Sequence, residues 1–145
     1  MEKLRKSSHN KIYVSFYFKT YSLPCFTELY NLIYKEGKKF ITKEITNLLT
    51  ARALAFWLQD DASWSTSKKT VIISTHSFSH KECKLLCLAL KSNLNLIAMP
   101  NKDIRLKNGS QSYVIRFSSN SDNIEKLRAL MIEHFHPSML YKLGL

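Results

Sequence analysis

The stretch Thr50-Ala-Arg-Ala-Leu-Ala-Phe-Trp-Leu-Gln-Asp-Asp-Ala-Ser63 decides the fold that we predict for this chain. Thr50 is a suitable N-cap, because its side-chain oxygen can accept a hydrogen bond from the first turn of a helix. Leu54, Trp57 and Leu58 then recur at helical spacing and share one face. These features predict a helix from about residue 51 to residue 60.

Two neighbouring carboxylates, Asp60 and Asp61, end this predicted helix. Their position is locally unfavourable, because the C-terminal end of a helix dipole is already partly negative. A divalent cation would offset that charge, since carboxylates and the free carbonyls of a helix end are ligands suited to Mg²⁺. The alternative is that both side chains face water, or that Asp61 caps the next turn. The spacing alone leaves these readings open.

The sequence before this helix predicts a strand and a helix. Residues 11–18 alternate between apolar and polar positions, as in a half-buried strand. Pro24 can open a helix at its first turn, and apolar residues then recur at helical spacing up to a stop at Gly37. The basic pair Lys38-Lys39 follows.

The sequence after this helix alternates strands and helices. Strands are expected at 71–75 and near 95–99, and a hairpin turn at Asn108-Gly109 leads to a return strand at 113–117. Three helices are expected: one that begins with the capping-box spacing Ser79-His-Lys-Glu82 and runs to about Ser92, one capped by Asn120 or Ser121, and a short one after Pro137. This order predicts an α+β fold with antiparallel pairing.

The chain has 145 residues, which suits one compact domain or one full repeat with part of another. Its 22 basic residues outnumber the 11 acidic ones, so the net charge of +11 indicates an anionic partner, with nucleic acid first and an acidic membrane surface second. No apolar run approaches the roughly 18 residues that a membrane span requires, and we expect no membrane partner.

The three cysteines, Cys25, Cys83 and Cys87, are odd in number and scattered, which does not resemble a disulfide framework. A reducing compartment is therefore expected. The first residues carry neither a secretory signal nor an organelle import signal. The composition leans toward residues with A/T-rich codons, which suggests an organelle genome, a mitochondrion more than a chloroplast.

The stretch 50–63 resembles the motif helix of the LAGLIDADG homing endonucleases, particularly the branch with an Ala-x-Trp-x-x-Asp-Asp-Gly core. The similarity continues through Ile73-Ser-Thr-His-Ser-Phe-Ser79 and His136-Pro-Ser-Met-Leu-Tyr-Lys-Leu143. These three segments occur in the family's order over residues 50–143. The chain is thereby identified as a member of this family, intron-encoded in type.

The resemblance implies a LAGLIDADG-like α+β repeat, in which a saddle-shaped antiparallel sheet backed by helices lies in the DNA major groove. Asp61 matches the acid that binds a divalent metal such as Mg²⁺, with the backbone carbonyl of Ala62 as a further ligand, and Asp60 matches the less critical residue before it. Ala62 stands where the family usually has Gly, and alanine is costly there if that position requires a positive φ.

The resemblance also implies basic residues that support catalysis near the metal. By position, Lys39 or Lys38 looks like one of them, and Lys142 looks like its counterpart from this repeat. The alternatives are a solvated surface pair for Lys38 and Lys39, and a cation at the end of a C-terminal helix for Lys142.

Polar and basic residues on alternate sheet positions are expected to face DNA, where Arg and Lys can pair with guanine or with phosphates. A shift of one residue in register would invert the choice. The candidates are Lys68, Thr70, Ser74, His76, Lys102, Arg105, Lys107, Ser112 and Arg116.

Only one motif helix is present, whereas family enzymes use two. We expect residues 1–47 to be the tail of a preceding repeat and residues 48–145 to be the endonuclease repeat. Cleavage of double-stranded DNA would then require a homodimer or a second chain that supplies the other acid. The alternative function is a protein that binds intron RNA on the same scaffold, as a splicing cofactor or structural component, and a third is an inactive reading frame.

Overall fold

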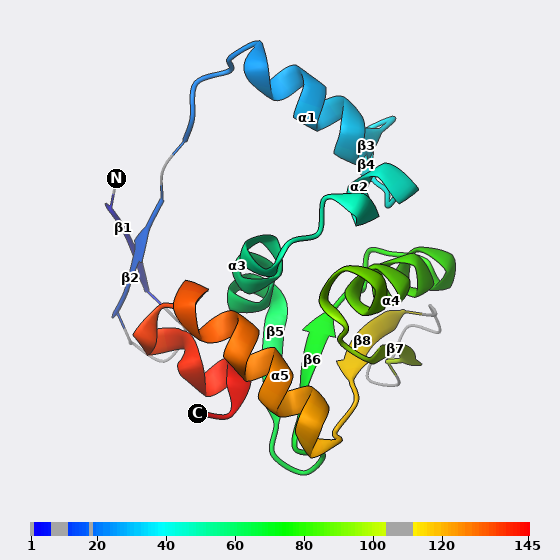
Figure 1. Ribbon diagram of the computed structural model, residues 1–145. Helices are drawn as coiled ribbons and strands as arrows, with labels where there is room; N and C mark the ends of the chain where they lie inside the picture. Colours follow the sequence, from blue (N-terminus) through cyan, green and yellow to red (C-terminus); the bar gives the residue numbers. More distant parts are fainter. Residues whose placement is uncertain (1, 7–11, 18, 104–111) are drawn as a thin grey trace. The chain divides into compact units, whose positions relative to one another are not determined.

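The computed structural model describes residues 2–6, 12–17, 19–103 and 112–145, with side chains described from residue 17 onward. The chain forms two compact units, residues 1–31 and residues 32–145 (Figure 1). The predicted Asn108-Gly109 turn lies outside the described residues. In the described part of the chain, no helix is long and apolar enough to cross a membrane.

The first unit contains an antiparallel pair of strands, β1 (Glu2–Lys6) and β2 (Ile12–Phe16). The strand predicted at 11–18 is thus confirmed as β2, while β1 was not predicted. Helix α1 (Cys25–Ile33) crosses the boundary between the units.

The predicted extension of this helix to Gly37 is wrong. A tight hairpin of β3 (Tyr34–Lys35) and β4 (Lys38–Lys39) follows Ile33 directly. Glu36 and Gly37 both have positive φ, +52° and +73°, and two successive residues of that conformation end a helix and turn the chain back. Gly37 is therefore part of a hairpin turn.

The predicted motif helix is confirmed as α3 (Ala51–Asp61), which follows the short helix α2 (Lys43–Asn47). The Thr50 hydroxyl accepts a hydrogen bond from the Ala53 amide at 3.2 Å, as its N-cap position predicts. Leu54 and Leu58 are fully buried, whereas Asp61 at the end of the helix is exposed. Helix α3 therefore packs its apolar face inward and presents its acids to solvent.

A four-stranded antiparallel sheet follows, with strand order β5-β6-β8-β7. Its strands are β5 (Ala62–Ser65), β6 (Thr70–Ser74), β7 (Ala98–Lys102) and β8 (Tyr113–Phe117). The strand predicted at 95–99 was placed about three residues early. Helix α4 runs to Leu94 and is closed by Asn95 at φ +53°, so β7 cannot begin until the chain has turned.

Helices α4 (His80–Leu94) and α5 (Ser121–Met131) join α3 over one face of this sheet (Figure 1). The predicted capping box is confirmed, because the Ser79 hydroxyl accepts from the Glu82 amide while Glu82 accepts from the Ser79 amide. Two 3-10 segments close the chain, η1 (Ile132–His134) and η2 (Pro137–Leu143).

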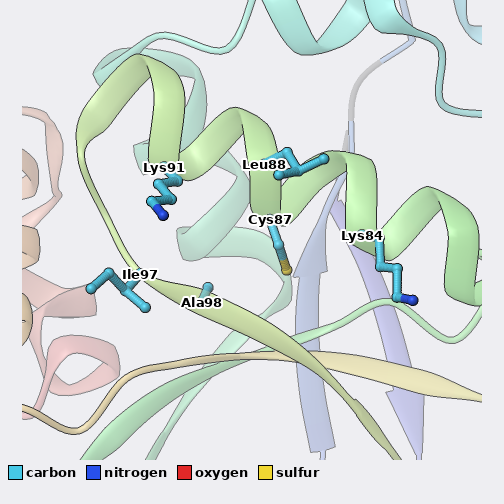
Figure 2. A pocket seen from close by; sticks show the side chains of 6 residues that line it. All are labelled: Lys84, Cys87, Leu88, Lys91, Ile97 and Ala98. Atoms are coloured by element: carbon cyan, nitrogen blue, oxygen red, sulfur yellow. The ribbon is translucent and has the colours of Figure 1, made fainter.

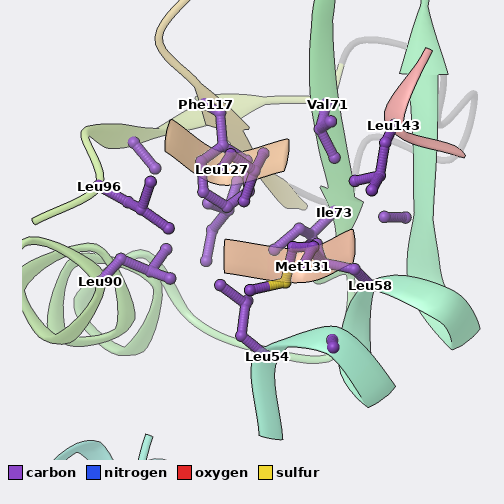
Figure 3. Close-up of a cluster of buried hydrophobic side chains, with 14 of the residues drawn as sticks. Leu54, Leu58, Val71, Ile73, Leu90, Leu96, Phe117, Leu127, Met131 and Leu143 are labelled. Carbon is purple, nitrogen blue, oxygen red and sulfur yellow. The ribbon is translucent and has the colours of Figure 1, made fainter. Parts of the chain in front are cut away.

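The core lies between the three helices and the sheet (Figure 3). Leu54 and Leu58 from α3 meet Ile73 from β6, Phe117 from β8 and Leu127 from α5, all with exposed fractions of 1% or less. Leu143 of η2 is also fully buried in this cluster. The C-terminal segment is therefore anchored in the core, beside the helix that carries the acids.

Candidate active site

The C-terminal end of α3 presents two acids and then changes directly into strand. Asp60 and Asp61 are both exposed, and Ala62 begins β5 with a φ of −92°. Any L-residue adopts that conformation readily, so alanine at this position carries no backbone strain. The conditional cost expected for Ala62 in place of glycine does not arise.

Lys142 lies against this helix end. Its Nζ donates hydrogen bonds to the backbone oxygen of Gln59 and, at 3.2 Å, to that of Asp60. The last carbonyls of a helix have no partners within the helix, and a cation there is favoured by the helix dipole. Lys142 therefore offsets part of the negative charge that the two carboxylates add at this point.

Lys39 lines a cavity together with the same two acids. This cavity, of about 430 Å³, is also lined by Ser74 and has apolar walls from α2, α3 and α4. Lys38 is exposed and does not line this cavity. The structure thus brings Lys39 and Lys142 to the same helix end, from segments about 100 residues apart in the sequence.

The segment that carries Lys39 is tied to the start of α4. The Ile41 amide donates a hydrogen bond of 3.0 Å to Oε1 of Glu82, whose other oxygen belongs to the capping box with Ser79. Burial opposes ionisation of Glu82, but the hydrogen bonds from Ser79 and Ile41 outweigh it and hold its pKa below the ordinary value. The ionised form of Glu82 is therefore the one that fixes this segment.

The donor set at the end of α3 fits a hard divalent cation that keeps most of its water. Among the residues that the structure describes, no group hydrogen-bonds to the Asp60 or Asp61 carboxylate. Mg²⁺ is often held by one or two carboxylates together with waters and substrate phosphates. Within the described ranges, no three His, Cys, Asp or Glu residues gather into a complete metal site. The described residues thus offer only part of the ligand set that a metal ion would need.

The faces of the sheet follow from its register. Ile73 pairs with Ala62 and Ile115, and these buried residues face the helices. The alternate positions lie on the other face, which the helices α3, α4 and α5 leave uncovered. The accessible positions of this open face, from β5 to β7, include Ser63, Ile72, Ser74, Arg116, Met99 and Asn101. Thr70 and Val114 have the same register but are buried.

Two of the predicted DNA-contacting residues, Ser74 and Arg116, lie on the open face. Arg116 stands on a central strand between Ile72 and Met99 in register, and among the described residues its Nε has no hydrogen-bond partner. Thr70 is fully buried, and its hydroxyl donates to the Phe117 backbone oxygen at 2.7 Å. Its side chain is therefore already engaged inside the protein.

The other predicted DNA-contacting residues are more scattered. Lys68 is exposed in the turn between β5 and β6. His76 is paired with Asp103 at 2.7 Å, and Ser112 is buried. Lys102 ends β7 opposite Tyr113, which places it on the helix side of the register. Arg105 and Lys107 lie outside the described residues.

Four residues of this region have roles that were not predicted from the sequence. Asn101 was missed because it lies beyond the strand expected near 95–99, and Met99 lies within that strand but is apolar, so it was not among the polar candidates. Gln59 and Glu82 act through long-range contacts with His136 and Ile41, for which no local pattern exists.

Comparison with known proteins places these features in a family. A sequence model of the LAGLIDADG DNA endonuclease family matches residues 1–124. The intron-encoded endonuclease ai4 of Dictyostelium discoideum is 30% identical over 144 residues, which cover 99% of this chain and 86% of that protein. The cytochrome b mRNA maturase bI2 of Debaryomyces hansenii is 29% identical over 140 residues, covering 97% of this chain and 50% of that protein.

Among solved structures, the homing endonuclease I-WcaI bound to its DNA recognition sequence aligns with 99% of this chain. The TM-score is 0.82 and the sequence identity is 23%. This chain spans 62% of the length of that one. The likeness supports the arrangement of an antiparallel sheet backed by helices.

Proposed function

The chain belongs to the LAGLIDADG DNA endonuclease family, and from this premise we propose that it binds double-stranded DNA and hydrolyses phosphodiester bonds at a specific site with a divalent metal. The predicted family, the α+β fold with its helix-backed antiparallel sheet, and the assignment to DNA endonucleases are confirmed. The observation that carries the mechanism is the convergence of Asp61, Lys39 and Lys142 at the end of α3.

In this proposal, Asp61 provides the carboxylate for the metal, with the backbone carbonyl of Ala62 as a second ligand. A bound divalent ion such as Mg²⁺ would supply Lewis acidity toward the scissile phosphate and lower the pKa of an attacking water. Lys39 lines the same cavity as Asp61, and we propose that its ammonium group stabilises negative charge on the phosphate there. Lys142, which hydrogen-bonds to the backbone oxygens of Gln59 and Asp60, is the second cation that we propose supports catalysis there.

The open face of the sheet is the proposed DNA surface. Arg116 stands near its centre and is half-buried, and Ser63, Ser74 and Asn101 supply further polar groups. Lys68 extends the surface from the adjoining turn. Such a mixture of one guanidinium with hydroxyl and amide groups suits contacts to base edges and phosphates together.

We propose that a second acid comes from another motif helix, because residues 1–145 carry one such helix among the described residues. The outward side of α3 supports such a partner: Phe56 is 63% exposed and lies on the same helix as Asp60 and Asp61. We propose that a second copy or a separate chain packs its motif helix there. The lean of the composition toward residues with A/T-rich codons and the intron-encoded relatives support an organelle genome, with the mitochondrion preferred.

A cleavage screen tests this proposal. Purified protein is incubated with a supercoiled plasmid library that carries randomised inserts, with Mg²⁺ or with EDTA, while its mass in solution is measured. The proposal expects Mg²⁺-dependent cutting at a small set of sites by a species larger than one chain. The endonuclease proposal would be refuted if folded protein cut no DNA in Mg²⁺, both as a homodimer and when mixed with a candidate partner chain.

The resemblance to an mRNA maturase favours a second candidate function, binding of intron RNA. Two adjoining grooves, of about 250 and 590 Å³, follow α4 and share Leu88 and Lys91. The smaller lies between α4 and the segment 97–98, and the larger lies between α4 and α2. Figure 2 shows Lys84 and Lys91 on either side of Cys87 along α4. Lys43 lines the larger groove, and no acidic residue lines either one. A phosphate backbone suits such a surface.

Charge reversal on α4 tests the RNA proposal. Lys84→Glu with Lys91→Glu should weaken binding of a structured RNA transcript by at least about tenfold, because each phosphate contact contributes to affinity. DNA cleavage should be unchanged, since neither lysine lines the acid cavity. Lys126→Glu, an exposed lysine on α5, is the matched control. Unchanged RNA affinity in the double variant would refute this surface as the RNA site.

A further inference from the structure

We infer that Gln59 is a positioning residue, which holds Lys142 in place beside the acids of α3. The inference rests on the proposed endonuclease function. The Gln59 amide uses both its donor and its acceptor groups: Nε2 donates to the backbone oxygens of Ala55 and His134, each at 3.2 Å, and Oε1 accepts from the His136 amide at 2.8 Å. One side chain thus joins the motif helix to the C-terminal segment.

These contacts fix the start of η2, the segment that carries Lys142. His136 is the N-cap of η2, and its own ring accepts a hydrogen bond from the Ser138 amide. Because Gln59 accepts from the backbone of His136, it holds the first turn of η2 against α3. Six residues later, Lys142 returns to the backbone oxygens of Gln59 and Asp60.

The far end of η2 is held independently of Gln59. Arg128 donates to the backbone oxygens of Leu143 and Gly144, each at 3.0 Å, and Leu143 is fully buried. Loss of the Gln59 contacts would therefore loosen the start of η2 and leave its end attached. The expected consequence is local: the Lys142 side chain loses its fixed place while the fold is retained.

The fixed place of Lys142 matters because a lysine side chain is flexible. An ammonium group on a four-carbon chain loses considerable rotamer freedom when it is held in one position. Preorganised charges stabilise a transition state better than mobile ones, because no reorganisation is required during the reaction. Gln59 contacts neither phosphate nor metal in this scheme, and it acts on the reaction only through Lys142.

A double-mutant cycle separates positioning from a merely structural role. Gln59→Met, Lys142→Met and the double variant are compared in single-turnover DNA cleavage at saturating Mg²⁺ and DNA. If Gln59 acts through Lys142, each single variant is slower, and the double variant matches Lys142→Met within about twofold. Rate losses that multiply in the double variant would overturn the inference.

A readout without DNA or metal makes the test independent of activity. The Lys142 ammonium group should give a slowly exchanging ¹⁵N–¹H signal, assigned by its loss in Lys142→Met, because its protons are hydrogen-bonded to backbone oxygens. The signal should disappear in Gln59→Met. Its persistence there would refute the inference, whereas absence of cleavage by wild type would refute only the endonuclease proposal.

A matched pair of substitutions guards against a general loss of stability. Gln59→Glu removes the two hydrogen bonds donated by Nε2 and keeps the acceptor for His136. Asn123→Asp makes the same chemical change at an amide that donates to Ile97 and Ser118 and accepts from Ile97. Gln59→Glu should slow cleavage and weaken the Lys142 signal, and Asn123→Asp should do neither. Equal effects of the two substitutions on cleavage and on the Lys142 signal would show that Gln59→Glu acts only by lowering the stability of the fold.

Discussion

At the level of single residues, the acidic end of α3 shows what a sequence pattern can and cannot predict. The two carboxylates at a helix C-terminus required an opposite charge nearby, and that requirement follows from the helix dipole alone. The identity of the nearby cation does not, because Lys142 is separated from Asp60 by 82 positions. Family resemblance suggested Lys142, whereas its hydrogen bonds to the helix carbonyls come from tertiary packing.

Gln59 illustrates the same limit more strongly. A glutamine near the end of a helix has no special local signature, and its partners at 134 and 136 belong to the far end of the chain. Ala62 illustrates the reverse case. The family usually has glycine at this position, which would matter if a positive φ were required, but the φ of −92° shows that the chain passes from helix to strand without a left-handed residue.

The three cysteines should differ sharply in reactivity. Cys25 is exposed, whereas Cys83 and Cys87 are buried in the core. Burial raises the pKa of Cys87 to about 12 and also raises that of Cys83, so neither forms the reactive thiolate near pH 8. Titration of native protein with a thiol reagent at pH 8 should detect one rapidly reacting group, and denatured protein should show three. Rapid reaction of all three groups in the native state would contradict the packing of α4.

At the level of helices and strands, the elements with strong local signals were predicted near their observed bounds, whereas β7 was placed about three residues early and β5 was not predicted. Helix α3, the capping box of α4 and strands β6 and β8 follow from caps and periodicity. Strand β7 contains Pro100 and begins after a left-handed Asn95, and β5 has only four residues. Their pairing is decided by the neighbouring strands.

The start of α4 should carry a pH dependence that Glu82 controls. The folded-state pKa of Glu82 is lowered, so the stability that its ionised form contributes is present above the unfolded-state pKa near 4.5 and is lost as the pH falls below that value. Glu82→Gln should therefore lower the urea midpoint at pH 7. The difference from wild type should shrink between pH 5 and pH 3. A difference that is independent of pH over this range would argue against an ionised Glu82 in the fold.

The open face of the sheet should lose DNA affinity when Arg116 is removed. An arginine that contacts base edges or phosphates contributes on the order of 1–3 kcal/mol, so Arg116→Ala should weaken binding of the cleaved duplex by at least about fivefold. Lys126→Ala removes an exposed positive charge from α5, on the other side of the sheet, and should change affinity much less. Similar losses in both variants would indicate that net charge alone determines binding.

At the level of the whole molecule, the chain combines a small first unit with a larger one that contains every residue of the candidate active site. The units divide between residues 31 and 32. We retain the proposal that residues 1–47 descend from the tail of a preceding repeat and that residues 48–145 form the endonuclease repeat. The boundary between the proposed repeats, at residue 47, differs from the boundary between the compact units, at residue 31. The difference arises because α2 packs on α4: the Asn93 amide donates hydrogen bonds to the backbone oxygens of Thr46 and Leu49.

The proposed homodimer makes a prediction about how the two strands are cut. If cleavage needs two copies of Asp61, mixed dimers of wild type and Asp61→Asn should convert a supercoiled target mainly to nicked circles, whereas wild-type dimers should linearise it. The ratio of nicked to linear product on agarose gels measures this directly. Full linearisation by mixed dimers would mean that one acid serves both strands.

The most direct test of the central claim is single-turnover cleavage of a mapped target by Asp61→Asn in Mg²⁺. Asp61→Asn should bind the target as wild type does and cleave it at least about 10²-fold more slowly, because the substitution removes the carboxylate that holds the metal. Asp122→Asn, an exposed acid at the start of α5, should cleave normally. Cleavage by Asp61→Asn at the wild-type rate would contradict the assignment of Asp61 as the metal-binding acid.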